Sequence, residues 1–272
     1  MKNNKKIGII GLGLIGGSIL KELSNDFEVF GVSKSEATIE KAKKYSNNAS
    51  TDLNILKDCE IIFVCTPMNK TLEILDKLNT IISKDAIVTD CCSLKEFVTQ
   101  KDYNYNFIPS HPMAGTENNG FDASFVGLFK DAKWVLTPYK NTSNTQIKKL
   151  TEIIEQLGAT PIQTTPKEHD MAVALISHMP MLVSQGIFKA SSDNTLALKL
   201  ASSGFRDTTR LSMTNIEMAE DMINMNSKNI ETALLMLYKS IGELLKENYK
   251  EQISEIKDKR KNMYDKEGKN IL

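Results

Sequence analysis

The sequence lacks three features that would mark a specialised class of protein. It carries no net charge, because 34 lysine and arginine residues balance 34 aspartate and glutamate residues, so nothing points to nucleic acid or an anionic membrane. The longest weakly polar run, residues 7–20, is too short and glycine-rich to span a bilayer and lacks a signal-peptide cleavage pattern. The four cysteines form no CxxC pair. We therefore expect a cytoplasmic protein without a metal ion.

In the first part of the chain, short apolar runs alternate with helical patterns. Strands that alternate with helices predict βαβ units and a parallel sheet covered on both faces. The length of 272 residues leaves room for a second domain. The expected strands are residues 7–10, 27–32, 60–65, 86–90, 107–109 and 134–137, and the expected helices are 18–23, 36–45, 71–78 and 147–156.

After Thr165 and Pro166 the pattern changes to helical periodicity alone. Residues 168–249 show no convincing strand, and we expect the helices to break at Pro180, Asp193 and Gly204. The fold class that this predicts is α/β, with an N-terminal Rossmann-type, doubly wound parallel sheet over residues 1–165. An all-α domain follows over residues 166–272.

Residues 11–16, GLGLIG, follow a predicted strand directly and open a helix, which is the context that a dinucleotide-binding motif requires. Gly11 permits the tight turn, Gly13 lets the backbone approach a pyrophosphate, and Gly16 lets helix and strand pack closely. The helix N-terminus then offers N–H groups and the positive end of its dipole to the phosphates. This predicts a nicotinamide dinucleotide as cofactor.

The end of the second predicted strand bears on the choice between NAD and NADP. NAD sites usually place an acidic side chain there to hold the ribose 2′-OH. Here the strand runs into Ser33 and Lys34, a hydroxyl donor and a positive charge, which favours NADP over NAD. The alternative is a plain surface turn with a weak preference between the two cofactors. The predicted cofactor-binding residues are Gly11, Gly13, Leu14, Ile15, Gly16, Ser33, Lys34, Thr66 and Pro67.

His111 is one of three histidines and follows a predicted strand, so it should lie at the carboxyl edge of the sheet, where α/β proteins bind ligands. Oxidation of an alcohol by hydride transfer needs a base for the hydroxyl proton, and a histidine suits that task near neutral pH. Ser93 follows another strand and could reach the same crevice to orient the imidazole. The alternative is a purely structural histidine.

Several motifs occur together in one order, and together they resemble the prephenate/arogenate dehydrogenases of tyrosine biosynthesis. Besides the glycine motif they are DxxSxK at residues 90–95, HPMAGTE at 111–117, EHD at 168–170, SHxP at 177–180 and GFRD at 204–207. The resemblance spans about residues 5–250. It implies oxidative decarboxylation of a cyclohexadienyl substrate, with a helical domain that binds substrate and forms a homodimer.

The resemblance also implies roles for single residues. His111 would take the proton of the ring hydroxyl while hydride leaves the same carbon, and Ser93 would hydrogen-bond His111. Arg206 would hold a substrate carboxylate, for which a planar guanidinium is the best partner, unless it only pairs with Asp207. The further substrate-binding residues would be Thr116, Glu117 and His178, whereas His169 is expected to be structural.

One departure from the family pattern concerns the substrate. Prephenate-specific members read Ser-His-Leu-Pro-His, whereas this chain carries Met181 in place of the last histidine. The stretch 177–185 and the strand end at Ser33 look most like the NADP-using arogenate dehydrogenases of cyanobacterial type. The prediction is therefore arogenate with NADP, and the alternative is prephenate with NAD or NADP.

Two readings outside this family stay open. A β-hydroxyacid dehydrogenase would use a catalytic lysine, for which only Lys189 and Lys199 lie in the right region. A non-catalytic NADP-binding sensor would use the helical domain for a partner, and it would tolerate replacement of His111.

Overall fold

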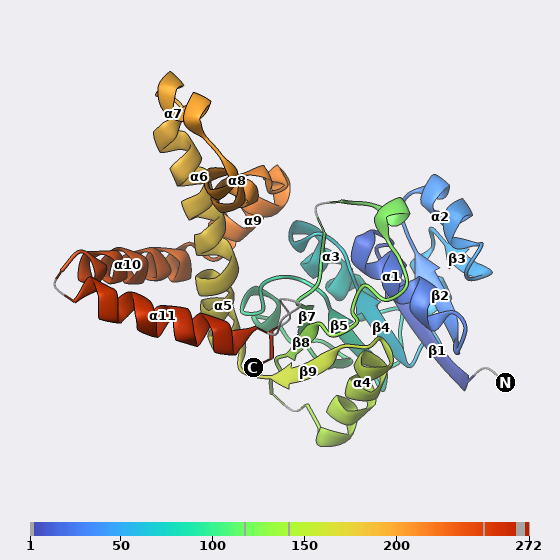
Figure 1. Ribbon diagram of the computed structural model, residues 1–272. Helices are drawn as coiled ribbons and strands as arrows, with labels where there is room; N and C mark the ends of the chain where they lie inside the picture. Colours follow the sequence, from blue (N-terminus) through green and yellow to red (C-terminus); the bar gives the residue numbers. More distant parts are fainter. Residues whose placement is uncertain (1–2, 117, 141, 247, 265–269, 272) are drawn as a thin grey trace.

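The computed structural model describes residues 3–116, 118–140, 142–246, 248–264 and 270–271. Six parallel strands form the main sheet in the order β3-β2-β1-β4-β5-β6 (Figure 1). Their bounds are β1 Asn3–Ile10, β2 Phe27–Val32, β3 Asn48–Ser50, β4 Ile61–Val64, β5 Ile87–Asp90 and β6 Asn106–Phe107. The strand order reverses beside β1, the point where open α/β sheets bind ligands. The predicted doubly wound parallel sheet is confirmed.

Both faces of the sheet are covered, as the apolar runs predict. In β4 all four residues are buried, and they alternate between two cores. Ile61 and Phe63 join a core with helices α1 (Leu14–Leu23), α2 (Glu36–Ala42) and α4 (Asn144–Gln156). Ile62 and Val64 join another with α3 (Met68–Leu78). This two-sided burial fixes the strand ends that carry the predicted site.

A second, three-stranded sheet extends the domain. Its strands are β7 (Ser110–Pro112), β8 (Lys133–Leu136) and β9 (Thr160–Gln163), with β7 antiparallel and β9 parallel to β8. The strand expected at 107–109 is confirmed only at Phe107, in β6, because the chain then leaves the main sheet and pairs with β8 from Ser110 onward. His111 therefore lies within β7, paired with Val135, and not in a loop.

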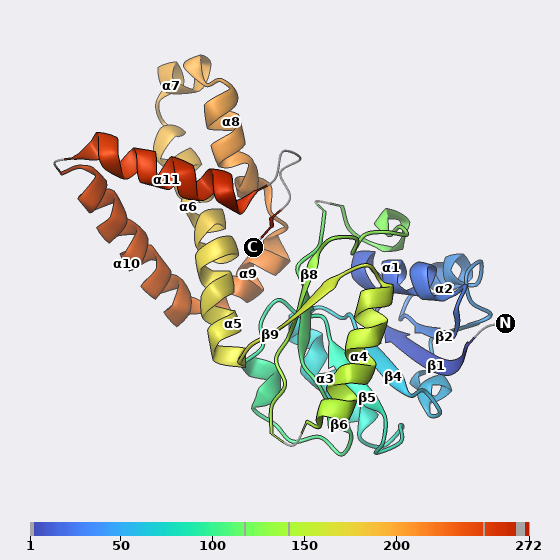
Figure 2. The ribbon, with the colours of Figure 1, turned by 60° about the horizontal axis from the view of Figure 1, so that its bottom comes forward.

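The second half is built from helices, as predicted, and its described residues include only one isolated β-bridge, between Tyr264 and Asn270. A continuous helix runs from α5 (Pro166–Val173) through a π-helical turn (Ala174–His178) into α6 (Met179–Ser191). It is followed by α7 Thr195–Leu200, α8 Ser203–Thr209, α9 Ile216–Met225, α10 Ser227–Leu244 and α11 Tyr249–Met263. The hairpin of α10 and α11 projects away from the sheet domain in both views (Figure 1, Figure 2).

The expected break at Pro180 was wrong. A proline cannot donate a backbone hydrogen bond, and the wider π-helical turn directly before it lets the helix continue without that bond. The break at Asp193 is confirmed between α6 and α7. Gly204 lies inside α8, so the break there comes slightly earlier in the chain.

By length and composition alone, the helix over Pro166–Ser191 could cross a membrane. The expectation that residues 7–20 are the longest weakly polar run was wrong, because residues 171–188 form a longer run without a charged side chain. This helix carries the buried polar residues His169, Asp170 and His178. Those side chains contact Lys95 and His111 in the sheet domain and Asn226 in the later helices, so this helix connects the two halves of the protein.

Candidate active site

The glycine motif forms a turn between β1 and α1 whose three glycines differ in their surroundings. Gly11 has a φ of +88°, and a Cβ there would lie 2.5 Å from the Cys65 carbonyl oxygen. A Cβ on Gly16 would lie 2.0 Å from the Gly11 oxygen. A Cβ on Gly13 would meet nothing within 4 Å, and Gly13 caps α1 without a side-chain hydrogen bond. Two glycines thus close the turn, and the third leaves room for a pyrophosphate at the helix N-terminus.

The other predicted cofactor residues follow neighbouring strands. Ser33 comes after β2; its N–H donates to the Ser50 carbonyl, and its hydroxyl accepts from the Ser35 N–H. Lys34 is exposed beside it. Thr66 and Pro67 join β4 to α3, with the Thr66 hydroxyl 3.0 Å from that of Thr71. Because β1, β2 and β4 are adjacent, these residues share one edge of the sheet with the glycine turn.

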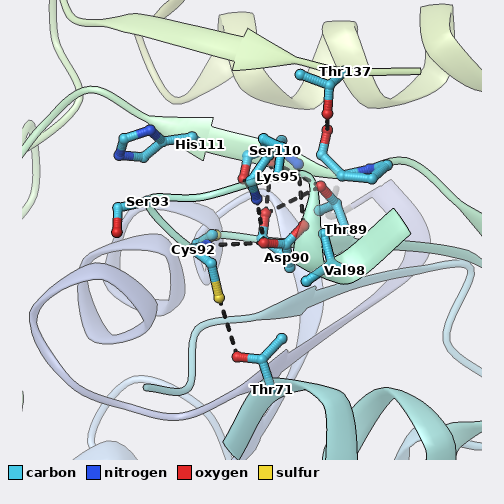
Figure 3. A network of polar contacts seen from close by, with 12 residues as sticks. Thr71, Thr89, Asp90, Cys92, Ser93, Lys95, Val98, Ser110, His111 and Thr137 are labelled. Atoms are coloured by element: carbon cyan, nitrogen blue, oxygen red, sulfur yellow. Dashed lines mark hydrogen bonds and ion pairs between the residues drawn. The ribbon is translucent and has the colours of Figure 1, made fainter. Parts of the chain in front are cut away.

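A buried ion pair holds the end of β5 against β7 (Figure 3). Asp90 and Lys95 are both fully buried, and the Lys95 Nζ also donates to the Ser110 carbonyl oxygen at 2.6 Å. The Ser110 hydroxyl in turn donates to the Asp90 carbonyl at 2.8 Å. A buried pair needs such additional hydrogen bonds to offset its desolvation. The network fixes the strand residue that precedes His111.

His111 contacts a second histidine from the helical half. Its Nδ1 lies 3.0 Å from the Nε2 of His169, and the Nδ1 of His169 lies 2.8 Å from the Asp170 Oδ1. A capping box between Thr165 and Glu168 fixes the start of α5, the helix that carries His169 and Asp170. Burial, followed by the nearby charges of His169, Lys95 and His178, lowers the pKa of His111 well below its usual value. The imidazole is therefore neutral at pH 7 and can accept a proton.

His178 occupies the π-helical turn and is 1% exposed. Its Nδ1 lies 3.2 Å from the Asn226 amide nitrogen, which also donates to the Asp170 carbonyl at 2.9 Å. Its Nε2 is buried without a hydrogen-bond partner among the described residues. Burial is the main cause that lowers the pKa of His178 to about 4. His178 therefore packs beside the His111 cluster as a neutral side chain.

Ser93 and His111 point to the same side, away from the Asp90–Lys95 pair (Figure 3). The Ser93 hydroxyl lies 3.3 Å from the Met68 sulfur, to which it donates. Among the described residues the Ser93 hydroxyl donates to Met68, and the His111 Nδ1 contacts His169, so the expected hydrogen bond from Ser93 to His111 is not formed in this structure. Ser93 nevertheless stands at the end of β5 next to β7, within the same region of the fold.

The predicted substrate residues are more scattered. Thr116 is exposed in the loop after β7, where its hydroxyl accepts from the Asn118 N–H, and Glu117 lies outside the described residues. Arg206 lies on α8 with its side chain 78% exposed, and its Nε donates to Asp207 at 3.1 Å. Among the residues that the structure describes, it pairs with Asp207 and does not join the cluster around His111.

Sequence reasoning missed His169, Asp170 and Asn226 as parts of this cluster. His169 was expected to be structural, yet it is the direct neighbour of His111. The EHD motif was a usable signal, because it opens the helix that follows the last strand of the sheet domain. For Asn226, which lies between two helices far along the chain, no local signal exists.

The cysteines and lysines bear on two alternatives, a redox or metal role for the cysteines and a catalytic lysine in the helical half. All four cysteines are free thiols, and Cys59 and Cys92 are buried, as expected for packing residues. Lys189 on α6 and Lys199 on α7 are both exposed, so neither stands in a buried catalytic setting. No group of three or more potential ligands that could hold a metal ion is found within the described residues.

A nucleotide turn at the head of a parallel sheet, a neutral imidazole at its carboxyl edge and a helical second half define an NAD(P)-dependent oxidoreductase. Comparison with known families then specifies it. Residues 16–163 match the family model described as prephenate dehydrogenase, nucleotide-binding domain, and residues 165–258 match prephenate dehydrogenase, dimerization domain. The chain therefore belongs to the prephenate dehydrogenase family.

Individual relatives agree with this assignment. The cyclohexadienyl dehydrogenase of Zymomonas mobilis is 30% identical over 238 residues, which cover 82% of this chain and 81% of the relative. The crystal structure of Synechocystis arogenate dehydrogenase has a TM-score of 0.81 at 36% identity, covering 93% of this chain and 95% of that one. Prephenate dehydrogenase from A. aeolicus, solved with hydroxyphenyl propionate and NAD+, has a TM-score of 0.84 at 27% identity, covering 95% and 98%.

Proposed function

We propose that this protein oxidatively decarboxylates L-arogenate to L-tyrosine and transfers the hydride to NADP. The observation that carries this proposal is the position of His111, held beside the carboxyl end of β5 by the hydrogen bonds of Ser110 with Lys95 and Asp90. We also propose that the protein is a cytoplasmic homodimer. Each copy would have a dinucleotide-binding domain over residues 1–165 and a helical substrate and dimerisation domain over residues 166–272. The free cysteines support the reducing compartment.

The glycine turn fits a dinucleotide, since only Gly13 has open space where a side chain would otherwise stand. Gly11, Gly13, Leu14, Ile15 and Gly16 would cradle the pyrophosphate. When bound, the nicotinamide ring supplies the hydride acceptor. Thr66 and Pro67, at the end of β4, would flank the cofactor beyond the pyrophosphate. The absence of a carboxylate at Ser33 and Lys34 supports NADP, because a serine hydroxyl and a lysine ammonium suit a 2′-phosphate.

His111 would accept the proton of the substrate's ring hydroxyl while hydride leaves the carbon that carries it. Loss of CO₂ restores an aromatic ring and makes the step strongly downhill, so the protein mainly positions the reactants. Ser93 would contact the same hydroxyl, and Arg206 would bind a substrate carboxylate. The residues proposed to line the remainder of the crevice are Thr116, Glu117 and His178.

Arogenate is favoured over prephenate by Met181, which is 3% exposed in α6 and offers no hydrogen bond where prephenate-specific members carry histidine. The 36% identity to the Synechocystis arogenate dehydrogenase supports the same choice. The alternative is a prephenate dehydrogenase that uses NAD or NADP. It is favoured by the similarity to the A. aeolicus prephenate dehydrogenase, whose structure contains NAD+.

A steady-state assay of all four combinations of arogenate or prephenate with NAD or NADP tests the proposal, with formation of the reduced nicotinamide as readout. A higher kcat/KM for arogenate with NADP than for any other combination is the expected result. A preference for prephenate or NAD would retain the family and refute the roles given to Met181 or to Ser33 and Lys34. Activity in none of the four would refute the proposed reaction.

A further inference from the structure

The contact between His111 and His169 has a direction that the surrounding donors determine. His169 and Asp170 are 2% and 3% exposed, so water does not compete for their hydrogen bonds. The Asp170 carboxylate accepts the Lys95 N–H at 2.8 Å on Oδ1 and the Glu96 N–H at 2.9 Å on Oδ2. A backbone N–H can only donate, so both carboxylate oxygens act as acceptors.

The tautomers of the two histidines follow from this. The His169 Nδ1, 2.8 Å from the Asp170 Oδ1, carries the hydrogen and donates it to the carboxylate. A neutral His169 then has a lone pair on Nε2, and the His111 Nδ1 at 3.0 Å must be the donor. His111 is thereby left with a lone pair on Nε2, the nitrogen that does not face His169. The order of donors resembles the way in which an aspartate orients a catalytic histidine in hydrolases, with one imidazole inserted.

The charges around the two rings are unequal. His111 is partly buried and lies within electrostatic reach of Lys95, whose Nζ is held by Asp90 and the Ser110 carbonyl. A positive charge on His111 is therefore unfavourable. His169 instead has its Nδ1 2.8 Å from the Asp170 Oδ1, so a positive charge on that ring would lie beside a carboxylate.

We propose that His111, His169 and Asp170 form a proton relay in which His169 positions His111 and takes over its charge. This inference rests on the proposed function. The substrate O–H bond breaks and a bond to His111 Nε2 forms, while the proton on His111 Nδ1 passes to His169 Nε2. His111 ends neutral in its other tautomer, and His169 becomes an imidazolium paired with Asp170. The electron pair of the C–H bond leaves with the hydride, and that of the O–H bond forms a carbonyl. Loss of CO₂ leaves its bonding pair in the ring as a phenolate, and the relay then runs backward to return the proton to the phenolate oxygen, so that the product leaves as the phenol.

Two replacements of His169 separate positioning from proton uptake. His169→Gln places an amide oxygen near the former Nε2, so it still accepts from His111 but cannot take a proton. His169→Leu removes both functions. Asp170 is left unchanged because it also caps the backbone at Lys95 and Glu96.

With His169→Gln, kcat should fall about tenfold to a hundredfold at unchanged substrate KM, less than the loss of a general base costs. His169→Leu should lose more. In the wild type, the acidic limb of the kcat/KM profile reports protonation of the pair, whereas in either variant it reports His111 alone. The limb should therefore move to lower pH in both variants, and the proton inventory of kcat in mixed H₂O and D₂O should change from curved to linear.

A merely structural His169 would lower kcat at every pH without moving the limb, and an unmoved limb with an unchanged inventory would overturn the relay. Nitrogen-15 NMR of the full-length protein, labelled at histidine, is independent of turnover. It should show His111 protonated on Nδ1 and not on Nε2; the opposite tautomer would overturn the proposal. If the wild type turns over none of the four substrate and cofactor pairs, the proposed function fails, and the tautomer measurement still decides the hydrogen-bond order.

Discussion

The sheet domain and the helical region bury their apolar side chains to very different degrees. In the sheet domain, Trp134, Leu136 and Leu150 are fully buried, and strands such as β4 have no exposed residue. In the helical region, neither α7 nor α11 buries a single residue. One face of α10 exposes three apolar side chains at helical spacing, Leu235 (64%), Tyr238 (79%) and Ile241 (48%), and its C-cap Leu245 (83%) continues them.

This difference shows that one half has a complete core and the other does not. Exposed apolar stripes of this kind mark surfaces that another protein covers. The helical region matches a domain whose family description is dimerization, which supports a second copy of this chain as the partner. The two halves meet at a polar seam, where His169 and Asp170 contact His111 and Lys95.

The prediction with the largest expected effect tests whether the chemistry takes place in the sheet domain. His111→Asn should reduce kcat by on the order of 10²–10⁴ because the proposed general base is lost. Affinity for the cofactor, measured by fluorescence titration, should change little, since the glycine turn is untouched. Unchanged turnover would instead favour the non-catalytic sensor.

Two leucine substitutions test whether the sheet domain has a complete core of its own while the exposed face of α10 is covered by a second copy of the chain. Leu150→Ala, in the sheet core, should lower the free energy of unfolding by about 2–5 kcal/mol without altering the oligomeric state. Leu235→Glu, on the exposed face of α10, should convert the dimer to monomers in sedimentation experiments. A wild-type protein that sediments as a monomer would contradict the role given to that face.

The seam should make stability depend on pH. The pKa of His178 is about 4 in the folded protein and about 6.5 in the unfolded chain, so the unfolded state binds more protons between these values. Stability should therefore be fully present above pH 6.5 and fall by about 3 kcal/mol from this residue as pH drops to 4.

Denaturant titrations at several pH values measure this dependence. His178→Asn keeps an acceptor for Asn226 and removes the titrating group. Its stability should therefore vary less with pH over that window than that of the wild type. An equal slope in the two proteins would show that other groups cause the loss.

The prediction with the smallest expected effect tests whether the helical region binds substrate. Arg206→Ala should raise the substrate KM by about 10- to 100-fold, the range expected for loss of a charged hydrogen bond. Arg206→Lys should recover only part of the affinity, because lysine keeps the charge and loses the planar fork. If KM stays the same in both variants, Arg206 serves only its ion pair with Asp207.

Much of the fold was predictable because its signals are local. The strand expected at residues 27–32 matches β2, and the glycine spacing placed α1 after the turn. The short strands β3 and β9 were not predicted, since β9 is largely exposed and β3 has only three residues. The break predicted at Pro180 does not occur because a π-helical turn accommodates the proline, and no local sequence pattern predicts such a turn.

The sequence by itself determined the class of fold, the glycine turn and the family, because each depends on residue types at fixed spacing along the chain. Only the tertiary structure decided that His111 faces His169, that Lys95 pairs with Asp90 in the core, and that Ser93 turns to Met68. These contacts depend on how α5 is placed against the sheet domain. That placement is set by packing among residues far apart in the chain, which local spacing does not encode.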